Sequence, residues 1–299
     1  LLLTLAGGLL FAGAATQDHS ARRLTFAAGL AAFVVLSVLL GVEAIWARPL
    51  NHTLHPQFDT GTIDRTTGRA TSVLVLMMWA AAGGLLAWGK LSIPRVACAV
   101  VVVVVGGAIS LQFNQLSNAI AFALALAAFG AGFIAPRFAV LATSTGVAAW
   151  TLAAPFATPL LLSNQRLLDV LPMTWAIRAG IWRYVIGRIP EQPLIGHGLD
   201  ASRTVTDFMV VRGDRVPAVW LHPHSASLQI WFETGAIGAL LAATGLFIGG
   251  WSLSRRFAND RPSAAAAAAT IAAIGVIANV SYGLWQEWWD AAMLLAAAL

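Results

Sequence analysis

Charged residues are scarce in this chain of 299 residues. Asp, Glu, Lys and Arg together make up 10% of it, whereas hydrophobic residues make up 59%. A soluble domain carries about 25% charged residues. This shortage disfavours a soluble globular protein, however apolar, and indicates a protein that lies largely within a membrane.

Cysteine and lysine each occur once. Cys98 has no partner for an internal disulfide bond, and it lies in an apolar run. Lys90 is the only lysine, so the other 17 of the 18 basic residues are arginines. These arginines are scattered over several short joints, and the net charge of +5 therefore does not indicate nucleic-acid binding.

An initiating methionine is also missing, because the chain begins at Leu1. At its other end the chain stops within an apolar run, at Leu299. We expect a fragment of a longer protein that lacks at least one amino-terminal helix. No signal peptide can be assigned on that expectation.

Long apolar runs, in contrast, are abundant. A helix of about 20 apolar residues crosses the roughly 30 Å of hydrocarbon in a bilayer. The runs predict an all-α fold, a polytopic transmembrane helical bundle that forms a single integral membrane domain over residues 1–299. The predicted helices cover residues 1–15, 24–46, 70–88, 93–112, 118–134, 138–161, 226–250, 264–284 and 288–299, of which the first and the last look truncated.

The basic residues of the short joints predict the orientation of this bundle. They fall on alternate joints, which we therefore place on the cytoplasmic side. The joint 47–69 and the long loop 162–225 then lie on the opposite side. Five of the six histidines share that side, an asymmetry that a purely structural membrane subunit does not require; they are His52, His55, His197, His222 and His224.

The loop 162–225 has helical character of its own. Residues 173–189 mix aromatic, aliphatic and basic side chains and end at Pro190. This composition predicts an amphipathic helix that lies along the membrane surface. At helical spacing, Trp175, Arg178 and Trp182 share a face, while Arg183 projects elsewhere, towards lipid headgroups or water.

Two glycines, Gly196 and Gly198, flank His197 after this helix. Glycine allows the backbone to bend sharply or to approach a ligand closely. An ordinary turn explains the same pattern, and both interpretations stay open.

The segment that leads into the helix at 226 concentrates polar residues. Ser225 or His224 is placed to cap that helix. Gln229 and Glu233 follow at i and i+4 and begin a polar face. A histidine at the mouth of a membrane bundle, His224 or His222, is suited to act as a general base at neutral pH. Hydrogen bonding at the interface is the alternative role for both histidines.

A zinc site is a further alternative. His222 and His224, together with Glu233 or Asp200, supply ligands of suitable type. Their spacing is not the helical His-x-x-x-His pattern, and Pro223 stiffens the pair. We therefore expect no metal.

Three short motifs, taken in order, resemble those of the bacterial O-antigen ligases within the O-antigen ligase/polymerase superfamily. They are Arg178-x-x-x-Trp182, Pro193-x-x-Gly196-x-Gly198, and His224-Ser225 followed after nine residues by Gly235-x-x-Gly238. The resemblance extends from about helix 24–46 onward. It includes Gly68-Arg69-Ala70-Thr71, which resembles the family's other basic position just outside the membrane.

Two departures leave ligase and polymerase both open. Ligases commonly have Thr after the second glycine, where this chain has Ala239. The histidine is often followed by Asn in the superfamily, where this chain has Ser225, which ligases also use.

The resemblance implies a C-type glycosyltransferase-like bundle in the bacterial inner membrane, with its site on the periplasmic side. Such enzymes move a glycan from undecaprenyl diphosphate to the hydroxyl of an acceptor sugar. The acceptor is lipid A–core for a ligase and another lipid-linked repeat for a polymerase. The implied reaction needs no cofactor or metal.

The resemblance also implies roles for individual residues. Arg69 and Arg178 are expected to clamp the diphosphate, since arginine is always charged and offers paired N–H donors. His224 is expected to take the proton from the attacking hydroxyl, in one displacement with inversion. Arg65 is the alternative to Arg69, and His222 the alternative to His224. The expected supporting residues are Gln229, Glu233, Gly196 and Gly198.

A transporter for lipid-linked sugars is the main alternative from another functional class. Transporters typically show inverted repeats and broken helices with polar residues near the midplane of the membrane. In this sequence the polar residues gather at one face of the predicted bundle, which favours a transferase.

Overall fold

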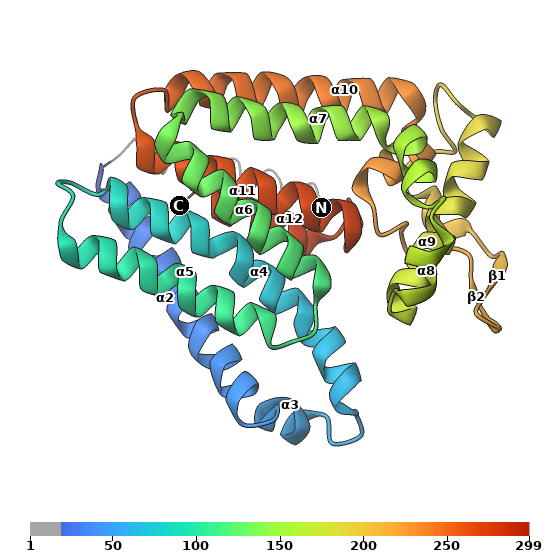
Figure 1. Cartoon of the computed structure of the whole chain (residues 1–299), viewed down its shortest axis with the longest axis horizontal. Helices are drawn as coiled ribbons and strands as arrows, with labels where there is room; N and C mark the ends of the chain where they lie inside the picture. The colour runs from blue at the N-terminus through green and yellow to red at the C-terminus, as the bar shows by residue number, and fades with distance from the viewer. Residues whose placement is uncertain (1–18, 299) are drawn as a thin grey trace. The chain divides into compact units, whose positions relative to one another are not determined.

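The structure, a computed structural model, describes residues 19–298 (Figure 1). Helices dominate it. The helices are α2 (His19–Ile45), α3 (Pro49–Leu54), α4 (Thr60–Ala87), α5 (Ile93–Leu111), α6 (Leu116–Ile134), α7 (Pro136–Leu161), α8 (Gln165–Val170), α9 (Met173–Arg188), α10 (Ala226–Arg256), α11 (Arg261–Val280) and α12 (Glu287–Ala298). Two 3-10 turns, η1 (Ile189–Glu191) and η2 (Ala201–Thr204), and two strands, β1 (Phe208–Val211) and β2 (Asp214–Pro217), lie between α9 and α10.

Seven of the described helices are long and apolar enough to cross a membrane: α2 from Arg23 onward, α4, α5, α6, α7, α10 and α11. The predicted all-α polytopic bundle is thereby confirmed. The predicted helix 1–15 lies outside the described residues. The 12 residues of α12 rise about 18 Å, less than a bilayer core, so a membrane span at 288–299 stays a prediction.

The chain forms two compact units. Of the described residues, the first contains 19–143, 251–277 and 287–298, and the second contains 144–250 and 278–286. Helices α7, α10 and α11 contribute to both. Each unit is described separately below.

Helix α4 forms the centre of the first unit, where it contacts α2, α5, α6 and α12. Small residues allow the helices to approach closely, as in other membrane bundles. A Cβ atom on Gly83 would lie 2.3 Å from the Cβ of Ala266, and one on Gly132 would lie 2.3 Å from the Cα of Ala265. The buried Trp79 fills the centre of this packing.

The start of α4 corrects the prediction of a helix at 70–88. The helix begins ten residues earlier, at Thr60, and the Asp59 side chain caps it by accepting a hydrogen bond from Thr62 N at 2.6 Å. The first turns are polar, which hid them from a search for apolar runs. Arg69 consequently lies within the helix and not ahead of it.

A buried ion pair stabilises these polar turns. Arg48 Nε lies 2.7 Å from Asp64 Oδ1, and both side chains are buried. Arg48 also donates to the carbonyl oxygens of Glu43 and Gln112, and its guanidinium lies 4.3 Å from the centre of the Phe113 ring. The pair therefore joins the end of α2, the start of α4 and the end of α5. The buried guanidinium has both an opposite charge and hydrogen-bond acceptors, as a buried charge requires.

In the second unit, α7 and α10 run side by side (Figure 1). A Cβ atom on Gly250 of α10 would lie 2.1 Å from the Cβ of Ser144 of α7. Pro155 lacks an N–H and leaves the Thr151 carbonyl, four residues earlier, without its helical partner. The indole N–H of Trp231 donates to that carbonyl at 2.8 Å, so the proline makes the inter-helix bond possible.

Helix α9 runs across the ends of α7 and α10 instead of along them (Figure 1). The helix predicted at 173–189 is confirmed, with observed bounds of Met173–Arg188. Its predicted position along the membrane surface stays a prediction. Arg183 is exposed, as expected, and its side chain donates to the Leu162 carbonyl at 2.9 Å.

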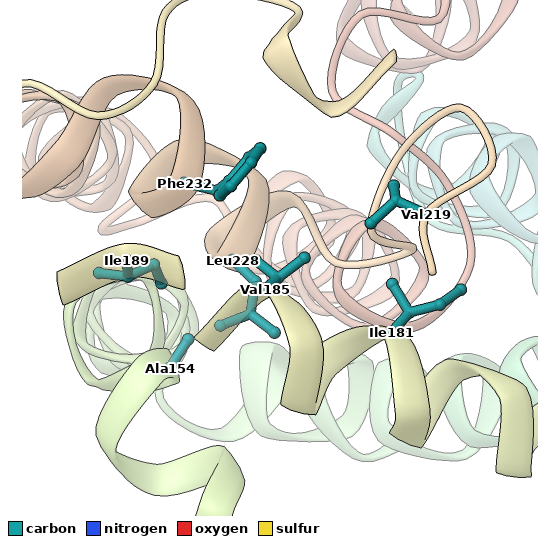
Figure 2. Close-up of a cluster of buried hydrophobic side chains, with 7 residues drawn as sticks. All are labelled: Ala154, Ile181, Val185, Ile189, Val219, Leu228 and Phe232. Carbon is teal, nitrogen blue, oxygen red and sulfur yellow. The ribbon is translucent and has the colours of Figure 1, made fainter. Parts of the chain in front are cut away.

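An apolar stripe fixes α9 against the start of α10. Figure 2 shows Ile181 and Val185 of α9, and Ile189 of the turn η1 that follows it, facing Leu228 and Phe232 of α10. All five side chains are buried. Because Arg178 lies one turn before Ile181, this packing also sets its position near the beginning of α10.

The sequence analysis did not predict the β1–β2 hairpin. Val211 pairs with Asp214, so the loop has only two residues, Arg212 and Gly213, both with positive φ. Such loops match the right-handed twist of short antiparallel strands. Each strand has only four residues, too few for an alternating pattern to be recognised in the sequence.

Two helix bounds near the carboxyl end also differ from the prediction. Helix α11 ends at Val280, whereas the sequence predicted a helix to residue 284. Helix α10 extends to Arg256, beyond the predicted 250, and it is broken at Gly235. Both differences bear on the candidate site.

Candidate active site

His224 lies in the turn that precedes α10 and has a positive φ of 56°. Its Nδ1 lies 2.6 Å from the carbonyl oxygen of Ser281. A carbonyl oxygen only accepts hydrogen bonds, so Nδ1 must carry the ring proton. Within the described residues Nε2 has no hydrogen-bond partner, which leaves its lone pair available to take a proton.

His222 is arranged differently. Its Nδ1 accepts a hydrogen bond from the backbone N–H of His224 at 3.1 Å. The proton of a neutral ring then sits on Nε2, which lies 2.8 Å from Gln286 Nε2. Two donors cannot bond to one another, so we assign the Gln286 amide with its oxygen in that position. Both nitrogens are engaged and the residue is buried. Of the two candidates, His224 is the one with a free nitrogen.

Hydrogen bonds from three directions hold this turn. Trp182 of α9 donates its indole N–H to the Pro223 carbonyl at 2.9 Å. Ser225 Oγ accepts from Leu228 N and so caps α10, one of the two predicted options. Asn279 at the end of α11 accepts the N–H of the second α10 residue through its Oδ1, at 3.2 Å.

Arg178 is the cation whose charge acts on His224 in this turn. It shares a face with Trp175, whose ring centre lies 5.3 Å from the guanidinium carbon, as the helical spacing predicted. Burial lowers the pKa of Arg178, and the neighbouring Tyr282 opposes that change. Arginine nevertheless remains charged at neutral pH.

The surroundings of His224 favour its neutral form. Burial, followed by the positive charge of Arg178, lowers the pKa of the imidazole to about 4, and the hydrogen bond to Ser281 partly opposes the shift. At neutral pH the ring is therefore uncharged and can accept a proton at Nε2. An anion placed beside Arg178 would offset the effect of its positive charge on His224 and so raise the basicity of the ring.

Gln229 and Glu233, predicted to begin a polar face of α10, are in direct contact. Gln229 Nε2 donates to Glu233 Oε1 at 3.0 Å, and both side chains are buried. The carboxylate accepts three further hydrogen bonds, from Ser202 Oγ at 2.6 Å, Asp200 N at 3.0 Å and Trp285 Nε1 at 2.5 Å. Its two oxygens thus accept from four neutral donors.

At the break in α10 at Gly235, the backbone of residues 193–198 forms hydrogen bonds with the helix on both sides of the break. The N–H groups of His197 and Gly198 donate to two carbonyls in the turn before the break, those of residues 232 and 233. The first two N–H groups after the break donate to the carbonyls of residues 193 and 194. Irregular backbone at membrane depth must be satisfied in this manner.

The glycines of the two segments permit this approach. A Cβ atom on Gly196 would lie 2.4 Å from the Glu233 carbonyl carbon, and one on Gly235 would lie 2.4 Å from backbone atoms of Leu194. Gly196 therefore makes room for the chain's own helix. Gly198 has φ +104°, and an added Cβ atom would meet nothing within 4 Å, so its conformation alone favours glycine.

The second glycine of Gly235-x-x-Gly238 also has a packing role. A Cβ atom on Gly238 would overlap the side chain of Thr234, at 1.8 Å from Oγ1. The broken helix folds Thr234 over this position. The spacing of the motif thus follows from the geometry of the break.

Arg65 and Arg69 belong to the first unit, where both are exposed on α4. Arg65 donates to Thr62 Oγ1 at 2.8 Å. A clamp made jointly by Arg69 and Arg178 stays a prediction, because the two arginines belong to different compact units.

The ligands considered for zinc do not gather. Within residues 19–298, no group of three or more His, Cys, Asp and Glu side chains is arranged to hold a metal ion. Asp200 pairs with Arg203 at 2.9 Å, and Glu233 accepts from four donors. His224 turns its Nδ1 proton towards a carbonyl.

The chain is similar to proteins named "putative polysaccharide ligase". One from Rickettsia conorii is 29% identical over 120 residues, which cover 38% of this chain and 28% of the relative. Those from Rickettsia typhi and Rickettsia prowazekii are 29% and 31% identical over 120 residues, covering 38% of this chain and 29% of each relative. The match thus spans less than a third of each relative's length. No family model and no solved structure matches the chain.

The loop between α11 and α12 corrects a further prediction. The sequence predicts a helix that includes residues 281–284, whereas Ser281 to Gln286 form turns that contact both histidines. Asn279, which supports the start of α10, was missed as well. The only signal was the succession of Ser281, Tyr282 and Gly283, since small and polar residues favour turns.

Removing the charge of Arg178 is expected to raise the pKa of His224. In Arg178→Gln the value should lie above about 4 and below 6.5, because burial, the larger cause, remains. Titration of the histidine ring signals by NMR measures it, with Arg183→Gln as a control that leaves the value unchanged. A wild-type midpoint at or above 6.5 would contradict the geometry.

The same shift links His224 to stability. The folded state has the lower pKa, so the unfolded chain binds the additional proton as the pH falls from about 6.5 to 4. The contribution of His224 to the free energy of unfolding is complete above pH 6.5 and is lost through this range.

Gly235→Ala is expected to destabilise the second unit by at least about 2 kcal/mol, because φ 63° and ψ −163° suit glycine alone and the added methyl group meets Leu194. Thermal unfolding followed by tryptophan fluorescence measures the effect. Gly245→Ala on the same helix is the matched control, since nothing lies within 4 Å of its Cβ position. Equal unfolding temperatures for the two variants would refute this account of the break.

Proposed function

We propose that the protein is a membrane glycosyltransferase that moves a glycan from undecaprenyl diphosphate to the hydroxyl of an acceptor sugar. The observation that carries the proposal is the state of His224. Its Nδ1 proton is held by the Ser281 carbonyl, its Nε2 is free, and Arg178 lies close enough to alter its pKa. A neutral base beside a permanent cation suits transfer away from an anionic leaving group.

The chemistry follows from these two groups. The acceptor oxygen attacks the anomeric carbon while His224 Nε2 removes its proton. The bond between that carbon and the diphosphate oxygen breaks, and the diphosphate leaves with the bonding electrons. Arg178 stabilises the charge that develops on it through paired N–H donors. One displacement of this kind inverts the configuration at the anomeric carbon.

The names of the Rickettsia relatives support polysaccharide ligation as the class of reaction. Lipid A–core is the acceptor that we propose, which makes the protein an O-antigen ligase. We place it in the bacterial inner membrane with the site on the periplasmic side, because the basic short joints face the cytoplasm. Arg69, with Arg65 as the alternative, is proposed as a second ligand of the diphosphate. No metal takes part in this reaction.

The break in α10 favours a second candidate, a transporter of lipid-linked sugars, because broken helices carry the binding sites of many transporters. The freed backbone groups around Gly235 are, however, hydrogen-bonded to residues 193–198. They are not available to a substrate. The transferase therefore remains the better supported function.

The decisive experiment incubates the purified protein, in lipid nanodiscs with EDTA, with an undecaprenyl-diphosphate glycan and lipid A–core. A glycan-bearing lipid A–core is the expected product. Longer lipid-linked glycan formed from the donor alone would indicate a polymerase. Movement of intact donor across a vesicle membrane without transfer would indicate the transporter, and activity lost in EDTA and restored by zinc would indicate a metal enzyme.

A further inference from the structure

The loop that connects α11 and α12, residues 281–286, contacts both histidines of the candidate site and the buried pair Gln229–Glu233. Its first residue, Ser281, accepts the Nδ1 proton of His224. Its last residue, Gln286, pairs with His222 at 2.8 Å. Between them, Gly283 lies so near His222 that an added Cβ would stand 2.6 Å from the ring. This contact is possible only for a residue without a side chain.

Two buried side chains of α10 anchor the middle of this loop. Gln229 Oε1 accepts the backbone N–H of Leu284 at 2.8 Å. Glu233 Oε2 accepts the indole N–H of Trp285 at 2.5 Å. Gln229 is itself oriented by Glu233, because its amide donates to the carboxylate and thereby turns its oxygen towards the loop. Both anchors therefore depend on one carboxylate.

We propose that Glu233 is a positioning residue, which holds the loop 281–286 so that the Ser281 carbonyl keeps the ring proton of His224 on Nδ1 and leaves Nε2 free. Only three residues separate Ser281 from Trp285, so little slack exists between the anchor and the carbonyl. The orienting role resembles that of a carboxylate behind a catalytic histidine, but it acts through a loop. The catalytic consequence rests on the proposed glycosyl transfer, whereas the effect on the tautomer does not.

The chemistry of Glu233 makes a sharp test possible. An ionised carboxylate only accepts hydrogen bonds, and four donors converge on this one. Glutamine has the same shape, but its NH₂ group would face donors and could not accept their hydrogen bonds. Glu233→Gln should therefore release Trp285 or Gln229 while it changes the packing volume little.

The groups that face His224 must be considered in such a test. They are Arg178 from α9, His222 from the same turn and Ser281 from the loop, and Tyr282 of the loop acts in turn on Arg178. None of them is altered in Glu233→Gln. A change in the titration or the tautomer of His224 would consequently report a movement of the loop.

The experiment records ¹⁵N signals of labelled histidine in the whole protein at neutral pH, where the two ring nitrogens are distinguished by their protonation. Wild type should show His224 protonated at Nδ1, and Glu233→Gln should show a mixture of tautomers. Glu191→Gln, at an exposed glutamate of the same unit, is the matched control and should resemble wild type. An unchanged His224 signal in a folded Glu233→Gln protein would overturn the proposal.

Trp285→Phe provides a second route to the same answer, because it removes the indole donor and leaves Glu233 in place. It should disturb the His224 tautomer as well, and combining it with Glu233→Gln should add little. A normal tautomer in Trp285→Phe together with additive effects would likewise overturn the proposal.

Transfer assays on the same variants then separate this proposal from the proposed function. We expect kcat to fall roughly 10- to 100-fold in Glu233→Gln with KM little changed, as is typical when a hydrogen bond that orients a histidine is lost. A disturbed tautomer in a protein whose wild type transfers no glycan would refute the transferase and leave the positioning role supported.

Discussion

Replacing His224 with alanine is expected to lower the rate of glycan transfer by a factor of about 10² to 10⁴ while the protein still inserts and folds. The variant removes the only ring nitrogen of the His222–His224 pair that is free to accept a proton. Loss at the chemical step lowers kcat, whereas donor binding, which depends on arginine, should change little. Single-turnover transfer from an undecaprenyl-diphosphate glycan measures the step directly.

His52→Ala is the matched control, because this histidine lies on the same predicted side of the membrane but in the other unit, where no side-chain hydrogen bond of the described residues involves it. It should transfer glycan at the wild-type rate. Normal transfer by a folded His224→Ala protein would refute both the base and the reaction proposed above.

Most of the fold could be predicted from the sequence because the bilayer imposes one dominant rule. Apolar runs long enough to span it must be helical, since lipid offers no partners for free backbone groups. Such runs located α5 and α6 to within about two residues of their observed ends. The same rule failed at α4, whose first ten residues are mostly polar and are stabilised by the buried pair Arg48–Asp64. Tertiary contacts of that kind leave no mark on local hydropathy.

The candidate site was predictable only in part, and for a related reason. The residue types near 178 and 222–233 indicated acid–base chemistry and anion binding, and the structure places Arg178 and His224 close enough to interact. Sequence alone could not choose between His222 and His224. That choice depends on Ser281 and Gln286, which are more than 50 residues further along the chain.

The break in α10 illustrates a second limit. Gly235 and Gly238 were noticed as a motif, but their physical role became clear only when residues 193–198 were seen within the break. A helix with an interior glycine is ordinary in a membrane. The four backbone hydrogen bonds that cross the break are long-range and have no local signature.

Arg178→Ala is expected to reduce transfer by a factor of about 10² to 10³, comparable with the loss of one donor that stabilises developing charge. Arg178 is half-buried, beside Trp175 and close enough to His224 to lower its pKa. Without it, the departing diphosphate loses its paired N–H donors, so both kcat and kcat/KM should fall. Measuring transfer rates over a range of donor concentrations separates the two quantities.

Arg178→Lys sharpens the interpretation. Lysine keeps the charge but presents a single point donor, so this variant should recover only part of the lost activity if paired donation to the diphosphate matters. Arg183→Ala is the control on the same helix. Arg183 is exposed and its one hydrogen bond, to the Leu162 carbonyl, should contribute at most about 1.5 kcal/mol to stability. If Arg183→Ala impaired transfer as much as Arg178→Ala, the helix would act through membrane binding and Arg178 would lose its proposed role at the diphosphate.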